Sequence, residues 1–189
     1  MKYNDRRNSK QNPMKNLVRE AIVVSNELGD VTYVGAIGVY LHTRKTRESQ
    51  DLDFAVASGL SREDAIKKGG YTKRVENKKE VIRTPRNVKV DIYDEDVSDI
   101  PVEILANTAK NIQVDKKGTI LRVACIEALI VSKHRASRHS RPQDNEDLYE
   151  LAQEKFHEID WNLLKSMTKS EHEFDTIKMA MKTLYDIKR

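Results

Sequence analysis

The strongest strand signal in this chain is the segment Asp51-Leu52-Asp53-Phe54-Ala55-Val56. Acidic and apolar residues alternate at its start, which is typical of a β-strand with one polar face. Side chains two residues apart on a strand point to the same side, so Asp51 and Asp53 would lie roughly 6–7 Å apart. Two carboxylates this close repel each other unless a cation sits between them, and Mg²⁺ prefers such oxygen ligands. A solvent-facing edge strand explains the same pair without a cation, because charged residues are common on sheet edges.

A second segment of the same type, Val88-Lys89-Val90-Asp91-Ile92-Tyr93, contributes another carboxylate. If this strand pairs with the first, Asp91 joins Asp51 and Asp53 on one face of a sheet. Three carboxylates around one or two magnesium ions are the arrangement used in two-metal phosphoryl transfer. The alternation therefore makes these three aspartates the candidate metal ligands, with Mg²⁺ or Mn²⁺ as the expected cation.

A glycine turn precedes the acidic strand. The run Val31-Thr32-Tyr33-Val34 predicts a short buried strand, and Gly35-Ala36 follows it before a helical segment over 37–43. A small-residue turn that opens a helix presents free backbone amides and the positive end of the helix dipole, which suits a phosphate. Close packing of the strand against the helix explains the same two residues without a ligand, and both interpretations stay open.

The remaining pattern predicts an α/β front half followed by a helical back third. The expected fold class is α+β, with a mixed β-sheet flanked by helices and then a C-terminal helical bundle. We divide the chain into a flexible arm (1–12), an α/β domain (13–124) and a helical region (125–189). The further expected elements are helices over 13–28, 61–68, 126–137, 143–156 and from 160 onward with a break near 169–170, hairpins over 71–83 and 111–123, and a solvated acidic loop over 94–99.

Composition limits the class of protein. The 189 residues include 34 Lys and Arg against 30 Asp and Glu, and this net charge of +4 permits a polyanionic partner without requiring one. A single cysteine excludes an internal disulfide framework and a multi-cysteine zinc site. No apolar run is long enough for a signal peptide or a membrane span, so we expect a cytoplasmic protein with no membrane partner.

Taken in order, these pieces resemble the nucleotidyltransferase superfamily that includes DNA polymerase β and the aminoglycoside nucleotidyltransferases. The superfamily signature is a hydrophobic strand, Gly-Gly or Gly-Ser, a helix, Asp-x-Asp and a later aspartate. The matching segments here are Tyr33-Val34-Gly35-Ala36-Ile37, Asp51-Leu52-Asp53-Phe54 and Val90-Asp91-Ile92. Ala36 departs from the signature, because it lacks the hydroxyl that a serine would offer to a phosphate.

A narrower resemblance is to the AbiEii/AbiGii-type branch, whose members are known as toxins of toxin–antitoxin systems. It covers roughly residues 31–151, and this chain lacks a large C-terminal domain. Gln143 stands where a basic residue is common in the branch. The three segments that carry the resemblance are Arg47-Glu48-Ser49-Gln50-Asp51, residues 126–133 ending in Lys133, and Arg141-Pro142-Gln143-Asp144-Asn145-Glu146-Asp147-Leu148.

The resemblance implies a metal-dependent nucleotidyltransferase. Such an enzyme moves an NMP from an NTP to a hydroxyl of RNA, such as tRNA, or of a protein, and a cognate antitoxin would be a further partner. By similarity, Asp51 and Asp53 would hold Mg²⁺ or Mn²⁺, and Asp91 would complete the site and help to deprotonate the acceptor hydroxyl. The residues that would contact the nucleotide are Gly35, Ala36, Arg47, Ser49, Lys133 and Asp144.

Several alternatives stay open. Lys133 reaches a phosphate or is a surface lysine at a helix end. Asp144 and Asp147 orient Lys133 or Arg141, or else they charge the start of the next helix, which we favour. Arg47 binds phosphate or pairs with a carboxylate, and the basic residues over 133–141 face an RNA backbone or solvent. For the whole protein, the alternatives are a catalytically inactive module of this fold that binds RNA or a partner protein, and a metal-dependent nuclease.

Overall fold

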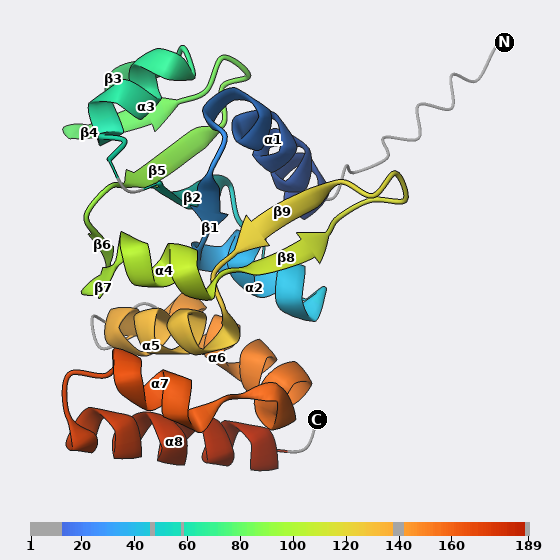
Figure 1. Ribbon diagram of the computed structural model, residues 1–189, viewed down its shortest axis with the longest axis vertical. Coiled ribbons are helices and arrows are strands. Elements are labelled where there is room, and N and C mark those ends of the chain that lie inside the picture. Colours follow the sequence, from blue (N-terminus) through green and yellow to red (C-terminus); the bar gives the residue numbers. More distant parts are fainter. Residues whose placement is uncertain (1–12, 46–47, 58, 138–141, 188–189) are drawn as a thin grey trace, which may run out of the picture.

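The computed structural model describes residues 13–45, 48–57, 59–137 and 142–187. In this part of the chain, a seven-stranded mixed sheet with the order β3-β4-β5-β2-β1-β9-β8 is followed by a layer of four helices, α5 to α8 (Figure 1). The predicted α+β architecture with a C-terminal helical region is thus confirmed. No helix among the described residues has both the length and the apolar composition needed to cross a membrane.

The elements follow the predicted order closely. The strands are β1 Val31–Tyr33, β2 Asp51–Val56, β3 Thr72–Glu76, β4 Lys79–Arg83, β5 Lys89–Tyr93, β6 Asp96–Val97, β7 Ile100–Pro101, β8 Lys110–Gln113 and β9 Ile120–Val123. The helices are α1 Pro13–Leu28, α2 Gly35–Thr43, α3 Arg62–Lys68, α4 Val102–Thr108, α5 Ile126–Ser137, α6 Pro142–Lys155, α7 Trp161–Met167 and α8 Glu171–Asp186, with a short 3-10 helix η1 at Phe156–Glu158.

Local chemistry explains where several elements begin and end. The Ser61 side chain accepts a hydrogen bond from the backbone N–H of Asp64 and so caps α3. Asn77 and Lys78 both have positive φ, of 50° and 64°, which is the conformation of a tight turn between β3 and β4. The α7–α8 break follows from Ser170, whose side chain caps the second helix.

The two faces of the sheet bury different sets of side chains. From β2, Leu52, Phe54 and Val56 pack into a core with α1, whereas Ala55 belongs to the core that includes the helical layer. Because side chains alternate along a strand, Asp51 and Asp53 share the face of Ala55. The alternation seen in the sequence therefore turns the acidic residues toward the C-terminal helices.

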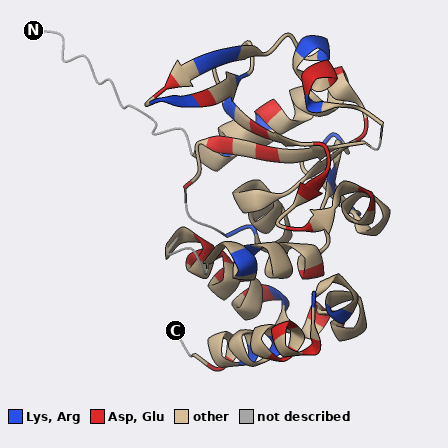
Figure 2. Cartoon of the chain, turned by 90° about the vertical axis from the view of Figure 1, so that its left-hand side faces the viewer, with Lys and Arg blue, Asp and Glu red and all other residues tan. Residues whose placement is uncertain are grey.

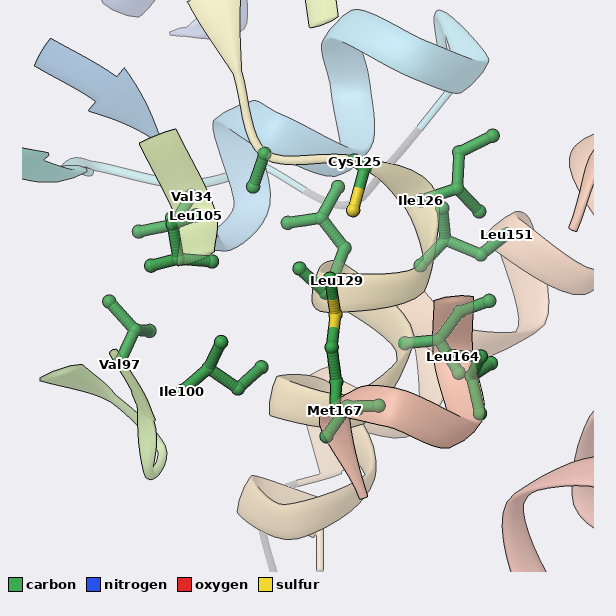
Figure 3. Close-up of a cluster of buried hydrophobic side chains, with 14 of the residues drawn as sticks. Val34, Val97, Ile100, Leu105, Cys125, Ile126, Leu129, Leu151, Leu164 and Met167 are labelled. Atoms are coloured by element: carbon green, nitrogen blue, oxygen red, sulfur yellow. The ribbon is translucent and has the colours of Figure 1, made fainter. Parts of the chain in front are cut away.

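The core beneath this acidic face is shared by the sheet and the helical layer. Val34 from the sheet side packs in one cluster with Leu129 of α5, Leu151 of α6 and Leu164 of α7 (Figure 3). The expected division between residues 124 and 125 falls inside this cluster and stays a prediction, and the expected arm over 1–12 lies outside the described residues.

Two features were not predicted. The 94–99 segment, expected as a loop, contains β6, which pairs with β7, and α4 follows directly. Val97, Ile100 and Leu105 are buried in the shared core, so these short elements are held by tertiary packing rather than by a local pattern.

The charged residues of the described chain are spread over the molecule. Basic and acidic residues are interspersed over the sheet and the helices (Figure 2).

Candidate active site

The register of β2 and β5 brings the three aspartates to one face of the sheet. The strands are parallel, and Asp53 lies directly opposite Asp91, while Asp51 lies opposite Lys89. Neighbouring strands are about 4.8 Å apart, so the side chains of a directly opposed pair are near neighbours. The predicted placement of Asp51, Asp53 and Asp91 on one face is therefore observed, since residues 38 and 40 positions apart in the chain lie on adjacent strands.

These carboxylates open onto a cavity of about 200 Å³ between the sheet and the helical layer. The sheet contributes Asp51, Asp53 and Asp91 to its wall, and the helices contribute residues from α5 and α6. Of the residues predicted to contact a nucleotide, those that line the cavity are Gly35, Ser49, Lys133 and Asp144.

Gly35 places the start of α2 at this cavity. It is the first residue of the helix and has a φ of +59°. The first N–H groups of any helix have no acceptor within the helix, and they carry partial positive charge. Ala36 differs from Gly35, because its side chain is almost fully buried and is absent from the cavity wall. The glycine turn therefore meets the cavity through Gly35 alone.

The pKa of Asp53 reflects first its burial and then the neighbouring carboxylates. The pKa of Asp53 is raised from 3.8 to about 7, chiefly by burial and then by the neighbouring charges of Asp91 and Asp51, while the charges of Lys133 and Lys89 oppose the rise. A bound cation would reverse this cost, since an opposite charge favours the ionised form. The donor set, three carboxylates on one face, is what Mg²⁺ or Mn²⁺ takes as protein ligands.

Lys89 is a site residue that the sequence analysis missed. Its Nζ lies 2.8 Å from Oδ2 of Asp51 and 3.7 Å from Oδ2 of Asp91. Partial burial lowers the pKa of Lys89, but the hydrogen bond to Asp51 and the charge of Asp91 outweigh it and leave the pKa raised. The same alternation that places Asp91 on this face also places Lys89 there, because Lys89 lies two residues before Asp91 on the same strand.

Within the described residues, no three acidic, histidine or cysteine side chains already lie close enough together to ligate one metal ion.

Lys133 is buried, so its interpretation as a surface lysine is wrong. Its Nζ lies 2.8 Å from Oδ1 of Asp144 and 2.6 Å from Oδ2 of Asp147, and all three side chains are at most 8% exposed. The favoured interpretation of the two aspartates is therefore incomplete. Asp144 does lie in the first turn of α6, but both carboxylates hold the Lys133 ammonium.

The other predicted residues have different outcomes. Ser49 lines the cavity and its hydroxyl lies 3.4 Å from the backbone O and N of Asp51, at the start of β2. Arg47 and Arg141 lie outside the described residues. Lys133 and His134 are buried, and the Arg135 guanidinium binds Glu173, so these three do not form an exposed basic patch.

Comparison with known proteins agrees with this fold. A search of curated proteins gave no significant match. The nucleotidyltransferase-like antigenic protein from Paracoccidioides brasiliensis superposes with a TM-score of 0.57 at 12% identity, over 91% of this chain and 93% of that one. JHP933 from Helicobacter pylori superposes with a TM-score of 0.51 at 19% identity, over 91% of this chain and 90% of that one. At these identities the structural likeness shows the fold alone.

The match that shows the family is in the sequence itself. Residues 14–183 match the family described as nucleotidyl transferase of unknown function (DUF2204), and this span includes all three site aspartates. The AbiEii/AbiGii-type branch is not named by that match and stays a prediction. With most of its length matched, the chain belongs to this nucleotidyl transferase family.

Proposed function

We propose that this protein transfers a nucleoside monophosphate from an NTP to an acceptor hydroxyl and releases pyrophosphate. The observation that carries the proposal is the parallel register of β2 and β5, in which Asp53 faces Asp91 with Asp51 beside them. The start of α2 at Gly35 and the ammonium of Lys133 share the cavity wall with these carboxylates. An anionic triphosphate suits both groups.

In this proposal, Asp51, Asp53 and Asp91 hold Mg²⁺ or Mn²⁺. When bound, the cations neutralise the triphosphate and lower the pKa of the attacking hydroxyl. The acceptor oxygen forms a bond to the α-phosphorus, the bond between that phosphorus and the bridging oxygen breaks, and pyrophosphate leaves. Asp91, whose side chain is 46% exposed, is the base to which the acceptor proton passes.

The acceptor that we propose is a hydroxyl of RNA, such as tRNA, or of a protein. This part of the proposal, together with a role as a cytoplasmic toxin held in check by a cognate antitoxin, is supported by the motifs shared with the AbiEii/AbiGii-type branch.

The test is label transfer from α-³²P-labelled NTPs, each incubated with the protein, Mg²⁺ and either total RNA or cell lysate. The wild type should label an RNA or protein band, and Asp53→Asn should lose about a hundredfold or more of that label. Asp30→Asn is the matched control, because Asp30 is an exposed aspartate paired with Arg122 on another part of the surface. Label that persists at the wild-type level in Asp53→Asn would contradict the proposed roles.

A second candidate function is a catalytically inactive module that binds RNA or a partner protein. It is supported by Ala36, which offers no hydroxyl to a phosphate, and by Gln143, an uncharged side chain in the cavity wall. Calorimetry with NTP and Mg²⁺ separates the two functions. An absence of nucleotide binding at millimolar concentrations would favour the module.

A further inference from the structure

Lys89 contacts two of the three carboxylates to which the proposed function assigns the metal ions. The ammonium hydrogen-bonds Asp51 at 2.8 Å and lies 3.7 Å from Asp91. It is held there by the backbone, since Lys89 is directly opposite Asp51 in the β2–β5 register. A divalent cation that uses the same two carboxylates would be a like charge at contact distance, and the two would repel strongly.

The other nearby lysine does not share this position. The Lys133 ammonium lies between Asp144 and Asp147, each within 2.8 Å. Among the residues that the structure describes, Lys89 is therefore the cation in contact with the catalytic carboxylates. Its side chain is 31% exposed, so its ammonium can change position without disturbing the core.

A second cavity gives the ammonium a place to move to. It has a volume of about 320 Å³ and is lined by Lys89, and it shares Ser49 and Asp51 with the wall of the first cavity. Asn16, Gln50 and Asn87 also line it, and their amide oxygens can accept hydrogen bonds from an ammonium.

We propose that Lys89 is an exchangeable counter-ion of the metal site. Without a divalent cation, Lys89 holds Asp51 and Asp91 through its ammonium. When the cation takes these carboxylates, the lysine side chain turns into the second cavity. Lys89 is thus a positioning residue, and it makes metal binding weaker than the three carboxylates alone would allow. This inference rests on the proposed function, because that function assigns the aspartates to the metal.

The test measures Mn²⁺ binding to the full chain by electron paramagnetic resonance, in the absence of nucleotide. Lys89→Met removes the competing charge, and we expect it to bind Mn²⁺ about tenfold more tightly than the wild type or better. Lys89→Arg keeps the charge and should bind no more tightly than the wild type. Lys73→Met is the control for loss of a positive charge elsewhere on the sheet, because Lys73 of β3 pairs with Glu63 and lines neither of the two cavities.

A second readout follows the lysine directly. Acetylation of the wild type by acetic anhydride, mapped by mass spectrometry, should increase at Lys89 when Mn²⁺ is added, because the carboxylates no longer hold the ammonium. Lys79, an exposed lysine of β4, should be labelled equally with and without Mn²⁺.

The outcomes separate this inference from the proposed function. If folded Lys89→Met binds Mn²⁺ no more tightly than the wild type, or if Lys73→Met shows an equal gain, the exchange role of Lys89 is wrong while the metal site stands. If neither the wild type nor Lys89→Met binds Mn²⁺, with or without NTP, both the exchange and the metal site are wrong.

Discussion

A Cβ atom added to Gly35 would lie 2.0 Å from Oδ2 of Asp53 and 2.7 Å from its Cγ. No side chain fits in that space, so the glycine that begins α2 gives the Asp53 carboxylate room beside the helix. This contact links the glycine turn to the acidic strand physically, although the two are 18 residues apart, and it explains why a glycine is needed at this position.

Gly35→Ala should therefore damage both the backbone and the carboxylate. The φ of +59° strains any residue with a Cβ, and the clash forces Asp53 to move. We expect a loss of about 1–3 kcal/mol in the free energy of unfolding and a loss of nucleotidyl transfer larger than the stability change explains. Chemical denaturation and the label-transfer assay measure the two effects.

Gly70→Ala is the control for the backbone alone. Gly70 has a nearly equal φ of +62°, but a Cβ there would meet nothing within 4 Å. Gly70→Ala should lower the free energy of unfolding by an amount similar to the backbone part of the Gly35→Ala loss, and it should keep the wild-type transfer activity. Equal activity of the two variants would show that the contact with Asp53 is unimportant.

Asp53 should also make the metal-free protein less stable as pH rises. Its pKa is raised from 3.8 to about 7, chiefly by burial and then by the charge of Asp91. Between these values the folded protein holds a proton that the unfolded chain has released, so the free energy of unfolding falls with increasing pH. Below about pH 4 the carboxyl is protonated in both states and the penalty is absent.

Urea denaturation in EDTA from pH 4 to pH 8 measures this effect. The wild type should lose stability across the interval, and Asp53→Asn, which cannot ionise, should lose clearly less. Saturating Mg²⁺ should reduce the wild-type loss, because the cation stabilises the ionised carboxylate. Parallel pH profiles for the wild type and Asp53→Asn in EDTA would mean that Asp53 ionises normally.

Lys133 should have a structural role as well as a role in nucleotide binding. Lys133→Met leaves the buried carboxylates of Asp144 and Asp147 without the ammonium between them, and we expect it to cost about 3–5 kcal/mol. Adding Asp144→Asn and Asp147→Asn removes the buried negative charges and should restore most of that stability. Thermal unfolding of the single and triple variants tests this.

Nucleotide binding separates the two roles of Lys133. The triple variant, once its stability is restored, should still bind NTP at least about tenfold more weakly than the wild type, because no ammonium reaches the phosphates. Calorimetry measures this affinity. If the triple variant binds NTP like the wild type, Lys133 only stabilises the contact between α5 and α6.

The sequence allowed most of the site to be predicted, for a specific reason. Alternation along 51–56 and 88–93 shows which side chains share a face, and this holds whichever strands become neighbours. What alternation cannot show is that β2 pairs with β5 in parallel, because the partner is selected by packing of the whole sheet. Lys89 lies within the same alternating segment, but the pattern does not distinguish it from a solvent-facing lysine on a strand.

The errors have a common physical origin in tertiary burial. Lys133 comes shortly after the apolar run 128–131, and α5 is buried on nearly all sides, so its lysine lies inside the protein rather than at a surface. The segments β6, β7 and α4 are too short for a periodic signal, and they are held by Val97, Ile100 and Leu105 in the shared core. Local patterns report neither effect.

Arg135 should hold the wall of the cavity beside the three aspartates to the helical layer. Its guanidinium makes two hydrogen bonds to Glu173 of α8, each 2.9 Å long, and a third of 2.6 Å to the backbone O of Ser98, a residue of the cavity wall. Both side chains of the ion pair are at most 10% exposed. Removal of one partner leaves a buried charge behind, which is far more costly than loss of an exposed pair.

We therefore expect Arg135→Met to lower the free energy of unfolding by about 3–5 kcal/mol and to raise the KM for NTP more than it lowers kcat. Lys165→Met is the control, because Lys165 pairs with Glu171 at the surface, where both side chains are about half exposed or more. Lys165→Met should lower the free energy of unfolding by at most about 1 kcal/mol, as for other exposed ion pairs. Urea denaturation and steady-state kinetics measure these effects. If Arg135→Met and Lys165→Met lost equal stability, the buried network would have no special weight, and Ser98 would be held in place by the packing of β6 and β7 instead.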